Sequence, residues 1–225
     1  MFRDRIDAGR QLAALVAALG PLEDPIVLGL PRGGVPVARE VARAIGAPLD
    51  VLVVRKLGAP GNPEFAVGAI GPDGVRVVDE RALRAMGVSD AALARIEHLE
   101  LEELQRRERR YRPARPALDL TGMTAVIVDD GIATGATASV ACRGARGLGA
   151  RRIILATPVA PAGWRESLLR AEGDAGGAIA DEVAVIQEPR DFWAVGQWYR
   201  DFGQTTDEEV LEALRDGEQE SGHDA

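Results

Sequence analysis

Short, almost entirely apolar runs alternate along this chain with segments of helical periodicity. Apolar runs bounded by prolines, glycines or charged residues are typical of strands buried on both faces. Strands are expected at 26–30, 49–54, 124–128, 152–159 and 183–186, and helices at 7–19, 35–45, 90–111, 137–148 and 162–171. Because strands that alternate with helices form parallel sheets covered on both sides, the sequence predicts an α/β fold with a parallel β-sheet core and flanking helices.

Length and charge narrow the class of protein further. The 225 residues suit a single domain, placed at 1–216 and followed by a disordered tail at 217–225. Thr206 and Glu209 fit a capping box that opens a last helix. The net charge of -8 argues against nucleic-acid and anionic-membrane partners, and the single cysteine, Cys142, fits a reducing compartment. With no apolar stretch long enough for a membrane span, we expect a cytoplasmic protein.

Some segments depart from the alternating pattern. The turn sequence Gly71-Pro72-Asp73-Gly74 lies between apolar runs at 65–70 and 75–78, and predicts a β-hairpin. The highly charged stretch at about 80–112 is expected to be a helical insertion, with a solvated helix lying over the core. A flexible turn is expected at 173–177.

The segment after the strand at 124–128 carries the clearest chemistry. Asp129 and Asp130 follow the strand directly, and a turn of small residues leads to a helix that begins near Thr137. Ligands of open parallel sheets bind at the carboxyl ends of strands, and the N–H groups at a helix start suit a phosphate. The carboxylates would repel a phosphate but suit vicinal ribose hydroxyls, and magnesium bound by those hydroxyls would relieve the charge. An ordinary strand-to-helix turn with capping threonines is the alternative.

The stretch Val128-Asp129-Asp130-Gly131-Ile132-Ala133-Thr134-Gly135-Ala136-Thr137 resembles the signature with which type I phosphoribosyltransferases bind phosphoribosyl pyrophosphate (PRPP). The resemblance implies that Asp129 and Asp130 hold the ribose hydroxyls. It implies that the 5′-phosphate is bound by the turn, at Ala133, Thr134, Gly135, Ala136 and Thr137. It also implies Mg2+ as cofactor, held through PRPP and not by direct protein ligands, with a small nitrogenous base as the second substrate.

The segment Leu30-Pro31-Arg32-Gly33-Gly34 also lies between a strand and a helix, and is similar to the pyrophosphate loop of this family. By that resemblance Arg32, Gly33 and Gly34 bind the leaving pyrophosphate, and the bond Pro31–Arg32 is a cis peptide. Alone, an Arg-Gly-Gly segment is commonly just a turn. Its place upstream of a PRPP-like loop is what favours the functional interpretation.

Arg55-Lys56 resembles the basic pair before the flexible loop of adenine- and xanthine-type members. The resemblance implies that Arg55 contacts the pyrophosphate and that residues 57–64 form a mobile lid. A lid that excludes water would protect a cationic sugar from hydrolysis. The alternative is a basic pair that faces solvent at the end of a strand.

The segment from Pro189 to Gly196 resembles the hood of purine phosphoribosyltransferases, and the whole hood is expected at about 187–205. In that hood an aromatic residue three positions before the glycine stacks on the base. Trp193 has that position here, with Phe192 adjacent. A cluster of aromatic residues can equally well be part of the core.

The resemblance implies transfer of ribosyl 5-phosphate from PRPP to a nitrogen of a base, with release of pyrophosphate. Hypoxanthine-guanine enzymes carry an acidic residue where this chain has Ala133, so this loop cannot supply a general base. The alternative function is a PRPP-binding regulatory protein of the same fold without turnover. The sequence assigns no catalytic group and leaves a homo-oligomer open.

Overall fold

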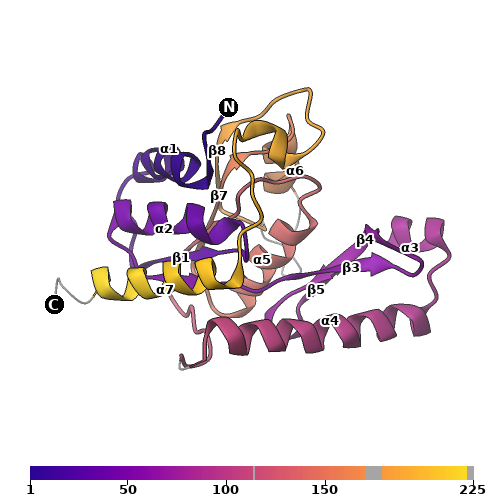
Figure 1. Ribbon diagram of the computed structural model, residues 1–225. Helices are drawn as coiled ribbons and strands as arrows, with labels where there is room; N and C mark the ends of the chain where they lie inside the picture. The colour runs from indigo at the N-terminus through magenta and orange to yellow at the C-terminus, as the bar shows by residue number, and fades with distance from the viewer. Residues whose placement is uncertain (114, 171–178, 222–225) are drawn as a thin grey trace.

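A parallel sheet forms the centre of the computed structural model, which describes residues 1–113, 115–170 and 179–221 (Figure 1). Its five strands lie in the order β2-β1-β6-β7-β8. They are β1 (Pro25–Gly29), β2 (Leu49–Val51), β6 (Thr124–Val128), β7 (Arg152–Val159) and β8 (Glu182–Gln187). Gly29 pairs with Val128, so β1 and β6 end side by side and the loops that follow them are neighbours.

Helices cover both faces of this sheet because its strands are apolar on both faces (Figure 1). In β1, Val27 belongs to the core cluster with the first helices, whereas Ile26 and Leu28 belong to the opposite cluster. One face carries α1 (Arg5–Ala17), α2 (Gly34–Ile45) and α7 (Asp207–Ser221), and the other carries α5 (Ala136–Gly147) and α6 (Trp164–Arg170). The predicted α/β fold with a parallel core is confirmed. No helix in the described part of the chain is both long and apolar enough to cross a membrane.

A second, antiparallel sheet extends from the core as an arm (Figure 1). Its elements are β3 (Arg55–Ala59), β4 (Asn62–Ile70), the short helix η1 (Pro72–Gly74) and β5 (Arg76–Val78). The predicted hairpin is confirmed by the antiparallel pairing of β4 with β5. The insertion is helical as expected, with α3 (Glu80–Met86) near the tip of the arm and α4 (Asp90–Tyr111) along its length.

The prediction of a loop at 57–64 is wrong. Most of this range lies in β3 and β4, which pair on either side of a tight turn at Pro60-Gly61. Leu57 and Val67 are fully buried in the main core cluster, so tertiary packing of the arm outweighs the glycine and proline content. The role of this segment as a mobile lid stays a prediction, with a β-hairpin in place of the expected loop.

Several boundaries also differ from the predictions. Strand β2 ends at Val51 instead of residue 54. The tail predicted to begin at residue 217 continues as helix α7 to Ser221, because Gly217 packs closely on β2: a Cβ there would lie 3.1 Å from Leu49 Cβ. The capping box is confirmed, since Thr206 N–H donates to Glu209 Oε2 (2.6 Å) and Glu209 N–H donates to Thr206 Oγ1 (3.1 Å). The turn predicted at 173–177 lies outside the described residues.

Candidate functional site

The loops after β1 and β6 touch at the carboxyl edge of the sheet. The N–H of Leu30 donates to the carbonyl of Val128 (2.9 Å), which holds the start of one loop against the start of the other. A Cβ on Gly33 would lie 2.0 Å from Asp130 Oδ2, and one on Gly34 would lie 2.5 Å from the Val128 carbonyl oxygen. The peptide bond Pro31–Arg32 is cis, as expected. The contact with backbone atoms thus requires glycine at position 34, whereas a side chain at position 33 would displace the Asp130 carboxylate.

The adjacent carboxylates Asp129 and Asp130 are partly buried and differ in their partners. Asp130 Oδ2 accepts a hydrogen bond from Arg5 Nε (2.8 Å), and Asp129 Oδ1 accepts from the N–H of Asp130 (2.9 Å). Burial raises the pKa of Asp129 well above its usual range, and the neighbouring charge of Asp130 raises it further. Burial also raises the pKa of Asp130, against the opposing effect of Arg5. Hydroxyl donors and a nearby cation would both stabilise such a pair, which fits ribose hydroxyls that carry magnesium.

Replacing Asp129 with asparagine is expected to change how stability depends on pH. An acid whose pKa is raised by folding stabilises the protein below its unfolded pKa, here 3.8, and that contribution is lost as pH rises toward the folded pKa. Asparagine can still accept from the N–H of Asp130 but does not titrate. Between pH 4 and neutrality, the wild type should therefore lose unfolding free energy relative to Asp129→Asn, as measured by urea unfolding. A difference that stays constant with pH would contradict the raised pKa of Asp129.

The turn before α5 presents its first residues to solvent. Ala133 and Thr134 are exposed, whereas Gly135 is buried and forms the N-cap of α5 with a φ of 80°. A Cβ on Gly135 would lie 2.3 Å from Nε1 of Trp164, so the indole supports the turn from beneath. The start of α5 thus offers free backbone N–H groups next to Asp129 and Asp130, where a 5′-phosphate is predicted to bind.

The two predicted pyrophosphate-binding arginines each face a carboxylate. Arg32 lies 4.0 Å from Asp207 at the start of α7, and Asp207 also accepts from the hydroxyl of Tyr111. Arg55, at the start of β3, forms an ion pair with Glu100 of α4 (2.7 Å). The alternative of a solvent-facing pair therefore fails for Arg55. Its role toward pyrophosphate stays a prediction, and so does that of Arg32.

The segment after β8 folds back onto the PRPP-like loop. Its short helix η2 (Val195–Trp198) touches the loop at Gly131, where a Cβ would lie 2.3 Å from Val195 Cγ1. Phe192 packs against the small core cluster of Phe2 and Tyr199, whereas the side chain of Trp193 is 89% exposed. The aromatic cluster is thus partly core. Base stacking stays a prediction for both residues, of which Trp193 is the exposed one.

Sequence reasoning missed two residues that hold Asp130. Arg5 contacts its side chain from α1, and the hydroxyl of Tyr199 donates to its carbonyl oxygen (2.5 Å). Tyr199 belongs to the aromatic cluster visible in the sequence, but no local motif marks Arg5.

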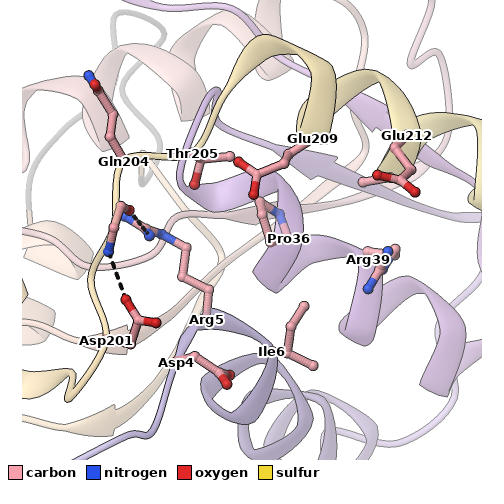
Figure 2. Close-up of a pocket in the computed structure, with 12 residues that line it drawn as sticks. Asp4, Arg5, Ile6, Pro36, Arg39, Asp201, Gln204, Thr205, Glu209 and Glu212 are labelled. Atoms are coloured by element: carbon pink, nitrogen blue, oxygen red, sulfur yellow. Dashed lines mark hydrogen bonds between the residues drawn. The ribbon is translucent and has the colours of Figure 1, made fainter.

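A cavity of about 460 Å³ lies beside Arg5, between α1, α2 and α7 (Figure 2). Asp129, Asp130 and the turn at 133–137 do not line this cavity, which is a neighbour of the site.

Strands β1 and β6 of the parallel sheet end in loops that touch, and the segment after β8 folds over these loops. This arrangement defines a type I phosphoribosyltransferase fold. The model of the phosphoribosyl transferase domain matches residues 3–168, and the chain belongs to this family.

The chain is similar over nearly its whole length to a solved structure and to two curated proteins. The solved structure of the protein TT1426 from Thermus thermophilus is 47% identical, with a TM-score of 0.76, and the match covers 96% of this chain and 98% of that one. Proteins of two Mycobacterium tuberculosis strains, CDC 1551 and H37Rv, are named "Putative phosphoribosyl transferase" and are 53% identical over 214 residues. The match covers 95% of this chain, which spans about half the length (46%) of these curated relatives.

Proposed function

We propose that this chain transfers ribosyl 5-phosphate from PRPP to a nitrogen of a small base and releases pyrophosphate. The observation that carries the proposal is the close approach of Gly33 and Gly34 to Asp130 and Asp129 at the adjacent ends of β1 and β6. Groups suited to pyrophosphate, ribose hydroxyls and a 5′-phosphate thereby lie at one edge of the sheet. The family membership of the chain supports the same assignment.

The protein groups of this site would act by positioning and electrostatics. The carboxylates of Asp129 and Asp130 would accept hydrogen bonds from the ribose hydroxyls, and the N–H groups at the start of α5 would hold the 5′-phosphate. Arg32 and the backbone around Gly33 would orient the pyrophosphate. Magnesium, brought by PRPP, would neutralise charge on the leaving group. The partly buried carboxylate pair fits that cation, because desolvation raises both pKa values and a nearby positive charge would offset that cost.

The test is release of pyrophosphate from PRPP and Mg2+ with a panel of bases: adenine, hypoxanthine, guanine, xanthine, uracil and orotate. Because Ala133 is exposed and has no proton acceptor, hypoxanthine and guanine should show kcat/KM about a hundredfold or more below the best acceptor. Ala133→Asp should change the order of acceptors. The variant with both Asp129 and Asp130 replaced by asparagine supplies the background rate. Efficient turnover of guanine or hypoxanthine by the wild type would show that the interpretation of Ala133 is wrong.

A PRPP-binding regulator without turnover is the second candidate. The observation that favours it is Ala133 in the exposed turn, because this loop then supplies no general base for the acceptor. PRPP binding without pyrophosphate release for any base on the panel would support this function over the first.

A further inference from the structure

Arg5 joins three parts of the molecule that are distant in sequence. From the first turn of α1, its Nε donates to Asp130 Oδ2 (2.8 Å). Its Nη1 donates to the carbonyl of Gly203 (2.7 Å), which is the bond drawn to Arg5 in Figure 2. Its guanidinium also lies over the ring of Phe202, 4.1 Å from the ring centroid. The side chains of Arg5 and Asp130 are only 13% and 14% exposed, so solvent screens their ion pair weakly.

The backbone of Asp130 is held by the same C-terminal segment. The hydroxyl of Tyr199 donates to the Asp130 carbonyl (2.5 Å), and the Tyr199 ring packs between Phe2 (5.4 Å) and Phe202 (4.9 Å). The N-terminus is tied in as well, because the N–H of Phe2 donates to the carbonyl of Trp198 (2.8 Å). Asp130 is therefore restrained at its side chain and at its main chain by groups that also fix residues 199–203.

We propose that Arg5 is a positioning residue for the ribose-binding carboxylate of Asp130, and that it couples occupation of the ribose site to the order of residues 199–205. This inference rests on the proposed function, since PRPP is the ligand concerned. The planar guanidinium bonds one carboxylate oxygen, Oδ2, and so directs the other toward the ligand. The same group holds the Gly203 carbonyl and the Phe202 ring, so a shift of Asp130 moves both.

The test uses Arg5→Met, Arg5→Lys and, as a matched control, Arg10→Met. Arg10 lies on the same helix and, although its side chain is 63% exposed, pairs with the buried carboxylate of Glu40 (3.0 Å), so its loss removes an ion pair of α1 away from Asp130. Calorimetric titration with PRPP and Mg2+ should give binding about tenfold to a hundredfold weaker for Arg5→Met, because a charged hydrogen bond is lost. Arg5→Lys should recover part of that loss, since an ammonium can bond one acceptor but lacks the planar guanidinium that bonds both Asp130 and Gly203. Arg10→Met should bind as the wild type does.

A double-mutant cycle with Asp130→Asn separates positioning from general destabilisation. If Arg5 acts through Asp130, Arg5→Met should weaken PRPP binding by less than threefold in the Asp130→Asn background, against about tenfold or more in the wild type. Hydrogen exchange provides a second readout. PRPP should slow exchange of the amides of residues 199–205 in the wild type, and this protection should be lost in Arg5→Met.

The outcomes distinguish this inference from the proposed function. A wild type that does not bind PRPP would overturn both. A wild type that binds PRPP, with Arg5→Met and Arg5→Lys both at wild-type affinity, would overturn the role of Arg5 alone. If Arg5→Met fails to fold, Arg5→Lys decides: weaker PRPP binding with reduced protection of residues 199–205 supports the proposal, and unchanged values for both contradict it.

Discussion

Replacing Asp129 and Asp130 together with asparagine is expected to reduce PRPP binding by about a hundredfold to ten-thousandfold, with the fold retained. Each carboxylate is predicted to accept a charged hydrogen bond from a ribose hydroxyl, and each such bond contributes about 1.5–3 kcal/mol. Asparagine preserves the shape of both side chains and can still accept the bond that Asp129 receives from the N–H of Asp130. Calorimetric titration with PRPP and Mg2+ measures the loss, and thermal unfolding confirms that the variant is folded.

Asp119→Asn is the matched control for this double replacement. Asp119 is an exposed acid on the segment that leads into β6, where it accepts hydrogen bonds from Thr121. It therefore lies at the opposite end of that strand from the site, and its replacement should leave PRPP affinity unchanged. Wild-type affinity in the double asparagine variant would show that the ribose is bound elsewhere.

Gly34→Ala is expected to have the largest effect on stability and also to remove PRPP binding. The added Cβ would lie 2.5 Å from the Val128 carbonyl oxygen and 3.0 Å from Asp129 Cα. Both are backbone atoms, which cannot rotate away, so the loops after β1 and β6 must separate. The expected loss of unfolding free energy is about 1–3 kcal/mol or more, measured by urea unfolding.

Gly147→Ala is the control for Gly34→Ala. Gly147 lies at the end of α5, and a Cβ there would meet only Val75 Cγ2 at 3.7 Å, an ordinary contact. Alanine in a helix should keep or raise stability, by about 0.5–1 kcal/mol. If Gly34→Ala unfolds within about 0.5 kcal/mol of the wild type and binds PRPP normally, the close approach of the loops is not required.

The arrangement of the central sheet was predictable because its signal is local. Each buried strand is a short apolar run between turn residues. Strands that alternate with helices form a parallel sheet. Since β1 and β6 are both followed by loops with ligand-binding features, their place at the carboxyl edge followed from the fold class. Their adjacency in the sheet is consistent with one shared site.

The arm and the last helix were harder to predict because tertiary contacts decide them. The glycines and prolines of 58–63 indicate a turn, but the burial of Leu57 and Val67 extends the strands on both sides of it. Gly217 and the charged residues after it suggest a frayed end, yet the contact with Leu49 continues α7. Neither of these long-range contacts can be predicted from the local composition.

The residues that hold the site in place could not be read from motifs. Arg5 and Asp130 are separated by 125 positions, so no spacing rule connects them. Trp164 supports Gly135 from a helix after the next strand, and its indole could equally have been a core residue. Motif spacing identifies the groups expected to touch a ligand, whereas the groups that orient them come from whichever elements the fold brings near.

A crystal structure of the complex with PRPP and Mg2+ tests the central claim most directly. The 5′-phosphate should lie against the backbone N–H groups of residues 133–137, and the ribose hydroxyls should lie within hydrogen-bonding distance of Asp129 and Asp130. The pyrophosphate should lie at Arg32 and Gly33, with magnesium on PRPP oxygens. PRPP bound instead in the cavity between Arg5 and Arg39, with the loop at 129–137 free, would contradict the assignment of this loop.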